Sequence, residues 1–392
     1  MHLSPAVRSI SESATLLMAQ RTREMRAAGK DIVDLSLGEP DQAPPAFAID
    51  AAKKVLEENK WNKYPPVMGY ADLRASIAHK FKRDNNLDYT PEQVMVSTGA
   101  KQAIMNVVVS LVGPGDEVVI PAPFWVSYAE QVRFTGATPV FVPSTLEENY
   151  KPPISRIAAA ITPRTRLLIF SSPCNPSGSV LTMAELEELA AVVLKWPDLY
   201  VLSDEIYEHI VFEGTHRSIG TVPGMMDRTI TVNGISKAFA LTGWRIGYIG
   251  APQWIVKAAN KVQGQFTSGA NTIAQRVAKA CVEADPALIQ NLRKDFLRRR
   301  DLVLKGLADV PGWRCTKPQG AFYVLPDVTS SLVGDIRSSS DLAMHLLEHA
   351  GVSLVEGDSF GAPNTVRISY ATSDALLTEA IARISKAIKA LH

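Results

Sequence analysis

Residues 93–113 read QVMVSTGAKQAIMNVVVSLVG, a short β-rich run that ends at Gly99 and leads directly into a helical stretch. The run has the length and β-branched content of a buried strand, and the stretch after the glycine repeats apolar residues at helical spacing. The same strand-then-helix unit recurs at 116–134 and 166–196. Strands that alternate with helices in this way predict an α/β fold with a mostly parallel sheet covered by helices on both faces.

Unusual polar residues come directly after several of these apolar runs. Gly99 ends the first, SSPCN at 171–175 follows another, Asp204 closes the run in LYVLSDEIY, and Ser236 and Lys237 follow TITVNG. Parallel strands end at the same edge of a sheet, and open α/β sheets bind their ligands there. We therefore expect these residues to line one site.

The pattern changes after about residue 284. A long amphipathic helix at 286–310 is followed by the strand-like runs GAFYVLP, GVSLVEG and NTVRISYA and by a terminal helix. A chain of 392 residues is also too long for one ordinary core. We expect residues 46–283 to form a large domain, and residues 1–45 with 284–392 to form a smaller α+β domain. The run Arg298 to Arg300 is expected to be a solvated helix face.

Charge and cysteine content narrow the classes of partner. The formal net charge is +1, which gives no field that favours nucleic acid or an anionic membrane, so a small molecule is expected. Cys174, Cys281 and Cys315 fit neither a disulfide framework nor a metal cluster, so no metal site is expected and a reducing compartment is favoured. The first residues resemble neither a secretory signal nor a membrane span, which predicts a cytoplasmic protein.

Residues 234–247, GISKAFALTGWRIG, hold one lysine and one arginine among small and apolar residues. Desolvation lowers the pKa of a lysine toward the free amine that attacks an aldehyde, although an isolated lysine in such a stretch is more often a helix-end residue whose head reaches water. Arg245 offers a fixed fork of donors that suits a phosphate. Together the two residues suggest pyridoxal phosphate as the cofactor.

That cofactor requires further residues, and the sequence offers them. A carboxylate must keep the ring nitrogen protonated, and Asp204 stands at the end of a strand, where it could also be a plain polar cap. Tyr207 could donate to the ring oxygen or be a half-buried core residue. Trp125 could stack on the ring. A helix that opens at Gly99, Ala100 and Lys101 could hold the phosphate.

With these residues in place, the chain resembles fold-type-I, class I/II pyridoxal-phosphate aminotransferases. Within them it is most similar to the bacterial aspartate aminotransferase subgroup that includes aspartate/prephenate aminotransferases. The resemblance runs over nearly the whole chain, in order and at normal spacing. It implies an aminotransferase (EC 2.6.1.-) that moves an amino group from an L-amino acid, aspartate or glutamate first, to a 2-oxo acid. The blocks that carry it are SLGEPD, KYPPVMGYADLR, GAKQA, PFWVSY, SSPCNPSG, SDEIYEH, GISKAFALTGWRIG, GAFYVL and VRISYATS.

The resemblance also implies roles for individual residues. Lys237 would be the Schiff-base lysine and proton shuttle, with Asp204 at the ring nitrogen and Tyr207 as a third catalytic residue. A homodimer with shared sites is implied, because Tyr64 and Ser268 would act from the neighbouring subunit. The implied cofactor-binding residues are Gly99, Ala100, Lys101, Trp125, Asn175, Asp204, Tyr207, Ser236, Lys237, Arg245 and Tyr64. The implied substrate-binding residues are Gly38, Thr15, Lys101, Trp125, Asn175, Arg367 and Ser268.

Substrate choice depends on residues near the N-terminus. In the subgroup that this chain resembles, a threonine and the lysine of the GGKQA block help to bind a distal carboxylate, and these correspond to Thr15 and Lys101. That correspondence favours dicarboxylic substrates. Some relatives that accept prephenate carry a basic residue a few positions before the threonine, whereas this chain has Ser11 and Glu12. A carboxylate there disfavours a further substrate anion.

Other functions remain compatible with these residues. The same constellation serves aminotransferases for aromatic or other apolar amino acids and fold-type-I carbon–sulfur lyases. A regulator that senses the cofactor is a rival of another class, but such proteins carry an added DNA-binding domain and the near-neutral charge of this chain argues against it.

Overall fold

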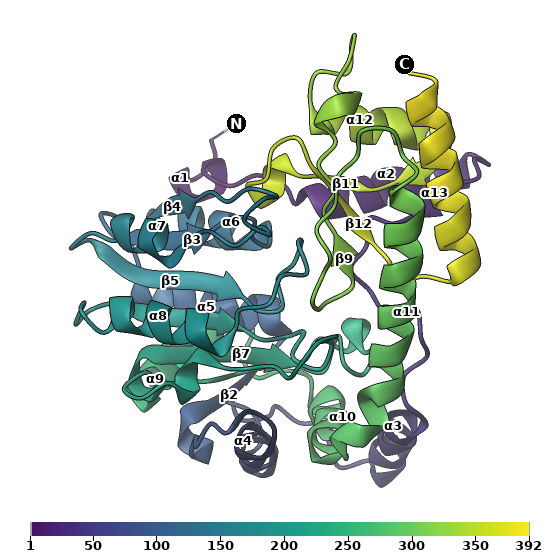
Figure 1. Ribbon diagram of the computed structural model, residues 1–392. Coiled ribbons are helices and arrows are strands. Elements are labelled where there is room, and N and C mark those ends of the chain that lie inside the picture. Colours follow the sequence, from purple (N-terminus) through teal and green to yellow (C-terminus); the bar gives the residue numbers. More distant parts are fainter. Residues whose placement is uncertain (1, 392) are drawn as a thin grey trace.

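The structure is a computed structural model that describes residues 2–391. Within that range, seven strands form the larger sheet, in the order β2-β8-β7-β6-β5-β3-β4 (Figure 1). Strand β8 runs antiparallel to both of its neighbours, and the other neighbouring strands are parallel. The strands are β2 (Val94–Ser97), β3 (Glu117–Pro121), β4 (Thr138–Val142), β5 (Thr165–Ser171), β6 (Tyr200–Asp204), β7 (Thr229–Gly234) and β8 (Gly247–Gly250).

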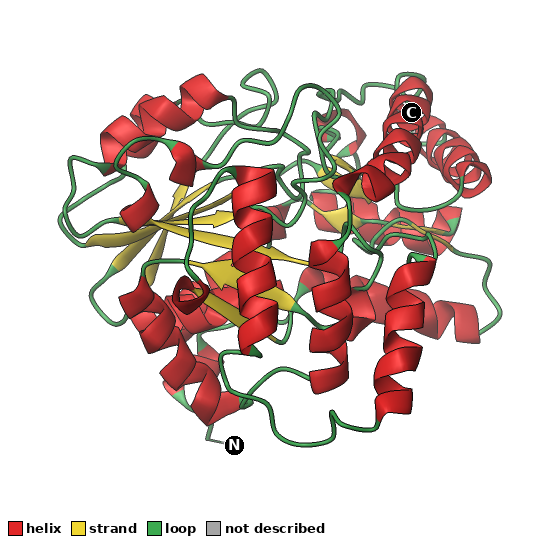
Figure 2. Cartoon of the chain, turned by 90° about the horizontal axis from the view of Figure 1, so that it is seen from below, coloured by secondary structure: helices red, strands yellow, loops and turns green. Residues whose placement is uncertain are grey.

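Helices cover both faces of this sheet (Figure 2). In β5, Leu167 and Ile169 pack against one group of helices, and Leu168 and Phe170 pack against another. This alternation is the period of two that a strand imposes, and an apolar run is needed because both faces are buried. The first group contains α5 (Ala100–Leu111), α6 (Ser127–Phe134) and α9 (Gln253–Phe266), and the second contains α7 (Ile154–Ala159) and α8 (Met183–Val193).

A third layer closes the β2 end of the sheet. Val94 and Val96 of β2 and Tyr248 of β8 pack there against three further helices. Asn59 and Asn86 end two of those helices in the left-handed conformation, which asparagine tolerates better than most residues. The helices are α3 (Ala46–Glu58), α4 (Ala71–Asn85) and α10 (Thr272–Glu283).

A smaller α+β unit follows α10 in the chain. Strands β11, β12 and β9 form an antiparallel sheet, and β10 pairs in parallel with β1 from the N-terminal part of the chain. The apolar side chains of β1, β9, β10 and β12 share one core with the long helices drawn beside them in Figure 1, whereas Val355 of β11 packs against Val126 and Phe360. The elements are α1 (Pro5–Arg8), α2 (Ala14–Ala27), β1 (Val33–Asp34), α11 (Gln290–Leu307), β9 (Tyr323–Val324), α12 (Ser339–His345), β10 (Val352–Ser353), β11 (Val355–Glu356), β12 (Val366–Ser369) and α13 (Asp374–Lys389).

The arginine run of α11 departs from expectation. Arg298 is exposed, but Arg299 and Arg300 are buried, so a solvated face is wrong for two of the three residues. Successive helical residues point in directions about 100° apart, and a run of three therefore cannot share one face. Arg299 forms a bidentate ion pair with Asp41 at 2.6 and 2.9 Å, which compensates its buried charge.

None of the helices in residues 2–391 is both long and apolar enough to span a bilayer.

Candidate active site

A cavity of about 290 Å³ lies at the carboxyl ends of the parallel strands. Ser171 and Asp204 are the last residues of β5 and β6, and Lys237 follows the end of β7. Arg367 reaches the same cavity from β12 of the smaller unit. Of the residues expected at the site, the cavity is lined by Thr15, Gly38, Ala100, Lys101, Trp125, Asn175, Asp204, Tyr207, Ser236, Lys237, Arg245 and Arg367.

Lys237 is one of the two lysines that line this cavity. Its Nζ donates a hydrogen bond to the carbonyl oxygen of Gly38 at 2.5 Å. Burial lowers the pKa of Lys237 to about 8, and the nearby charges of Arg367 and Arg245 act in the same direction. The neutral, nucleophilic amine is therefore accessible close to neutral pH.

Asp204 is the buried carboxylate of this cavity. Its Oδ2 accepts a hydrogen bond from the hydroxyl of Tyr128 at 2.7 Å, and its Oδ1 accepts one from the backbone N–H of Ile206 at 3.3 Å. Burial raises the pKa of Asp204 to about 6, and the Tyr128 hydrogen bond opposes that rise. Tyr128 is not among the residues expected at the site, because a tyrosine within the apolar block PFWVSY is typical of a core position.

A tight backbone approach forms one end of the cavity. Gly99 precedes the first residue of α5, and a Cβ atom at this position would lie 2.4 Å from Nη2 of Arg245. A Cβ atom at Gly247 would likewise lie 2.2 Å from the backbone nitrogen of Ala100. Within residues 2–391 Arg245 forms no ion pair, and its Nη1 donates only to the carbonyl oxygen of Thr242 at 2.9 Å. An arginine beside the free N–H groups of a helix start suits a phosphate.

Arg367 is a fully buried cation, with 1% of its surface exposed. Its Nη1 donates to Oδ1 of Asn175 at 3.0 Å, its Nη2 donates to the carbonyl oxygen of Ser36, and its Nε is buried without a partner. No carboxylate in the described part of the chain forms an ion pair with it. A buried guanidinium without a counter-ion is suited to a substrate carboxylate.

Two tyrosines flank these charged groups. The hydroxyls of Tyr207 and Tyr323 lie 2.8 Å apart, and the guanidinium of Arg367 lies 4.7 Å from the centre of the Tyr323 ring. Tyr323 has no role assigned from the sequence, although it belongs to the block GAFYVL. A Cβ atom at Gly38 would lie 1.9 Å from the Tyr323 hydroxyl, so the segment that carries Gly38 passes close to this ring.

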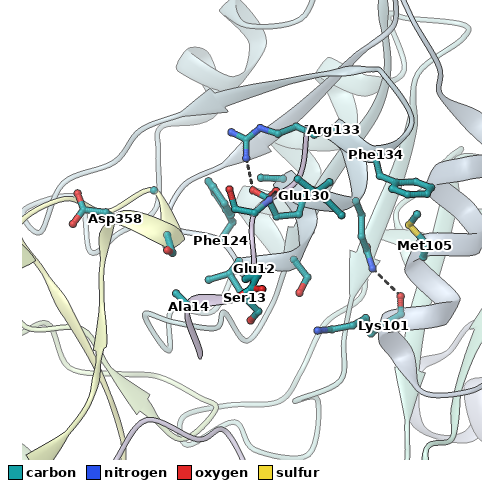
Figure 3. Close-up of a pocket in the computed structure, with 18 of the residues that line it drawn as sticks. Glu12, Ser13, Ala14, Lys101, Met105, Phe124, Glu130, Arg133, Phe134 and Asp358 are labelled. Carbon is teal, nitrogen blue, oxygen red and sulfur yellow. Dashed lines mark hydrogen bonds and ion pairs between the residues drawn. The ribbon is translucent and has the colours of Figure 1, made fainter. Parts of the chain in front are cut away.

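Lys101 also lines a second cavity, of about 480 Å³, which is drawn in Figure 3. Its Nζ lies 5.0 Å from the centre of the Trp125 ring. The pKa of Lys101 is lowered mainly by burial and to a smaller extent by the charge of Arg245. Glu12 lines the second cavity, together with the ion pair between Glu130 and Arg133. This side of Lys101 therefore carries an acidic group of the N-terminal segment. Thr15 lines the main cavity with its Oγ1 buried and unpartnered.

Three of the expected site residues do not line the cavity of this chain. Gly99 lies just behind it, against Arg245. Tyr64 is 95% exposed, and Ser268, with a φ of 58°, lies in the turn after α9. The last two residues are expected to act from a neighbouring subunit, and that expectation stays a prediction.

The residues of the cavity fit pyridoxal phosphate. An amine, a buried carboxylate and a helix start beside an unpaired arginine are the groups that an aldehyde, a pyridine nitrogen and a phosphate require. Buried polar atoms without partners also face the cavity, among them Oγ of Ser171 and Nε of Arg367. Such atoms are rare unless a ligand or water satisfies them.

A second titratable cluster lies outside this cavity. Glu205, Glu208 and His216 bring possible ligand atoms within 4.8 Å of one another. Glu205 already accepts hydrogen bonds from Ser203, Ser218 and His216, and Glu208 forms an ion pair with the buried Lys80. We interpret the cluster as an internal ion-pair network, because each carboxylate already has partners.

Comparisons with known proteins agree with this geometry. The family model described as aminotransferase class I and II matches residues 30–384. The bifunctional aspartate aminotransferase and glutamate/aspartate-prephenate aminotransferase of Petunia hybrida is 43% identical over 98% of this chain and 82% of its own. The aspartate/prephenate aminotransferase of Thermus thermophilus is 42% identical over 98% of both chains. The solved structure of the aspartate aminotransferase from Thermus thermophilus with maleate is 42% identical and has a TM-score of 0.94, covering 99% of this chain and 100% of that one.

Proposed function

This chain belongs to the class I and II aminotransferase family, and from that premise we propose that it exchanges an amino group between L-aspartate or L-glutamate and a 2-oxo acid. The family and the α/β fold predicted from the sequence are confirmed. The family depends on pyridoxal phosphate. The observation that carries the proposal is the gathering of Lys237, Asp204, Arg245 and Arg367 around one cavity.

The cofactor is held at three places. The start of α5 and Arg245 would hold its phosphate, Asp204 would pair with its ring nitrogen, and Lys237 would bind its aldehyde. When bound, the cofactor supplies the sink for the electron pair that a broken Cα–H bond leaves. The remaining contacts are assigned to Gly99, Ala100, Lys101, Ser236 and the partner subunit's Tyr64 for the phosphate, and to Trp125, Asn175 and Tyr207 for the ring.

The chain's own residues position the substrate and move its proton. Arg367 binds the α-carboxylate with its remaining donors, while Asn175 and the backbone at Gly38 hold the same end of the substrate. Lys237 accepts the Cα proton, and a pKa of about 8 makes its neutral form available for this role near neutral pH. Asp204 stays ionised to keep a proton on the ring nitrogen.

The distal carboxylate of the substrate is recognised by Lys101 and Thr15, which both line the cavity. Within residues 2–391 no carboxylate forms an ion pair with Lys101, so its charge is available to the substrate. Trp125 bounds the same space, and Ser268 of the partner subunit adds a contact. A related structure was solved with maleate, which is a dicarboxylate, and this supports the choice. Glu12 disfavours prephenate as the acceptor, because the ring carboxylate of prephenate lies one carbon farther from the oxo group than the distal carboxylate of oxaloacetate and would reach closer to Glu12.

The assembly is proposed from the resemblance, and the domain division and the compartment are proposed from the pattern and composition of the chain. We assign a two-fold homodimer in which each site is completed by the partner, and a division into a large domain, 46–283, and a small domain, 1–45 with 284–392. A cytoplasmic location is supported by Cys174, Cys281 and Cys315, which are all free thiols in the structure.

The first experiment is a single-turnover spectral assay. Enzyme loaded with pyridoxal phosphate is mixed in turn with aspartate, glutamate, an aromatic and a branched amino acid, and conversion to the pyridoxamine form is recorded. Fast conversion with aspartate and glutamate is expected. Conversion with apolar amino acids alone would overturn the substrate assignment, and release of pyruvate and ammonia from β-substituted amino acids without an acceptor would show a carbon–sulfur lyase instead.

A further inference from the structure

Tyr128 connects two groups of the site that the sequence treats separately. It lies in the first turn of α6 with none of its surface exposed, and its hydroxyl donates to Oδ2 of Asp204 at 2.7 Å. Its ring also meets the ring of Trp125 edge to face, with centroids 5.4 Å apart and planes at 84°. One side chain therefore touches both the carboxylate assigned to the ring nitrogen and the aromatic assigned to the ring face.

The hydrogen bond bears on the charge of Asp204. Burial raises the pKa of this carboxyl to about 6, close to the pH at which an enzyme works, and the negative charge of Glu205 raises it further. The Tyr128 hydroxyl and the Ile206 N–H act in the opposite direction, because both donate to the ionised form. Without the hydroxyl, Asp204 keeps a single N–H donor within the protein.

The other titratable groups around Asp204 do not replace Tyr128. The charge of Lys237 favours the ionised carboxyl of Asp204, but less than the two hydrogen bonds do. The Lys237 amine donates to the carbonyl oxygen of Gly38 and not to Asp204. The carboxylate of Glu205 is hydrogen-bonded to His216, and the hydroxyl of Tyr207 is hydrogen-bonded to that of Tyr323, so neither side chain donates to Asp204. Cys174 is a buried thiol whose pKa is raised by burial. Within residues 2–391 the Tyr128 hydroxyl is thus the one side-chain donor to Asp204.

We propose that Tyr128 is a positioning residue, which keeps Asp204 ionised and aimed at the ring nitrogen while it fixes the plane of Trp125. The inference rests on the proposed function, since it concerns how the same cofactor is held. A tyrosine that only fills the core would need neither its hydroxyl nor this orientation. Removing the hydroxyl therefore distinguishes a positioning role of Tyr128 from simple core packing.

The test compares Tyr128→Phe with a matched control, Tyr89→Phe. The Tyr89 hydroxyl is also buried in one hydrogen bond, to Thr231 at 3.0 Å, but it lies outside the cavity. Two quantities are measured for each protein: the dissociation constant of pyridoxal phosphate from the apoenzyme, and the pH of the acid limb of kcat. Thermal melting of both variants checks that each is folded.

For Tyr128→Phe we expect cofactor affinity to fall by about tenfold or more, the range for a lost hydrogen bond to a charged group. We also expect the acid limb to move up by about one pH unit, because Asp204 becomes easier to protonate. Tyr89→Phe should change neither quantity. In the background of Asp204→Asn, adding Tyr128→Phe should change affinity little, since the hydroxyl acts through the carboxylate.

Equal affinities and acid limbs in wild type, Tyr128→Phe and Tyr89→Phe would overturn the proposal. So would an additive effect of Tyr128→Phe in the Asp204→Asn background. A wild-type protein that takes up no pyridoxal phosphate, or that takes it up and transfers no amino group, would instead overturn the proposed function.

Discussion

Nη1 of Arg367 donates a 3.0 Å hydrogen bond to Oδ1 of Asn175, although the first residue lies in β12 of the smaller unit and the second follows β5 of the large sheet. The bond ties the cation assigned to the substrate carboxylate to the loop assigned to the cofactor ring. Arg367 has no carboxylate partner within residues 2–391, so its charge is available to a ligand. The residues proposed to bind the substrate are thus shared between both units.

Arg367→Lys should lower kcat/KM for aspartate by about ten- to a hundredfold. A lysine keeps the charge but loses the planar fork, and a hydrogen bond to a charged group contributes about 1.5–3 kcal/mol. Steady-state kinetics with aspartate and a 2-oxo acid measure the change. Arg314→Lys is the control, because Arg314 is exposed and pairs with Glu147 and Asp327 away from the cavity. Equal losses in the two variants would contradict the role of Arg367.

Lys237→Ala should abolish amino transfer and the visible absorption band of the bound cofactor, since it removes the amine assigned to the cofactor aldehyde. In the wild-type apoenzyme, the rate of cofactor uptake should rise as the pH passes through about 8 and then level off. Burial lowers the pKa of Lys237 to that value, and only the neutral amine attacks an aldehyde. Stopped-flow absorbance measures this rate. An uptake rate that keeps rising to about pH 10, as for an exposed lysine, would refute the effect of burial.

Lys80→Met should destabilise the fold by about 3–5 kcal/mol, because it leaves the buried carboxylate of Glu208 without its counter-ion. Urea unfolding at neutral pH measures the loss. Lys82→Met is the matched control on the same helix, where the ion pair with Asp88 is exposed and should contribute about 1 kcal/mol or less. Adding Glu208→Leu to Lys80→Met should restore much of the stability. If the two lysine variants unfold alike, Lys80 does not compensate a buried charge.

The same pair predicts the pH dependence of stability. Burial opposes ionisation of Glu208, but Lys80, His209 and His216 together outweigh it, with Lys80 the largest of the three, and hold the pKa of Glu208 well below its ordinary value. The folded-state pKa is thus depressed. The stabilisation is fully present above the unfolded-state pKa of about 4.3 and is lost as the pH falls through the lower folded-state value. In Lys80→Met this acid-dependent loss should shrink, which urea unfolding between about pH 3 and pH 7 would measure.

The fold and part of the cavity could be predicted from local signals in the sequence, whereas Arg367, Gly38 and Thr15 were placed by the family resemblance. Strand ends mark the edge of a parallel sheet, so Asp204 and Lys237 could be placed together before their distances were known. Pairings between distant segments give no such signal. Lys80 and Glu208 lie 128 positions apart, and Tyr128 is one tyrosine in an apolar block until its hydroxyl is found beside Asp204. Tyr64 depends on a second copy of the chain and could be placed only by resemblance.

Glu12→Lys should shift acceptor preference toward prephenate. Glu12 lines the cavity beside Lys101, where we expect its carboxylate to repel the ring carboxylate of prephenate, which lies one carbon farther from the oxo group than the distal carboxylate of oxaloacetate (Figure 3). Reversing the charge replaces repulsion with attraction. Exposed pairs contribute about 1 kcal/mol or less each, so the ratio of kcat/KM for prephenate over oxaloacetate should rise by about tenfold. Because the effect acts between partly exposed charges, it should weaken as salt is raised. Competition assays with both acceptors at low and high salt measure the ratio directly.

Glu188→Lys is the control, since it makes the same charge change on an exposed residue of α8 outside both cavities. If Glu12→Lys and Glu188→Lys give the same ratio, Glu12 does not contribute to the choice between the two acceptors. The selectivity must then come from groups deeper in the cavity, and Lys101 and Thr15 are the first residues to substitute.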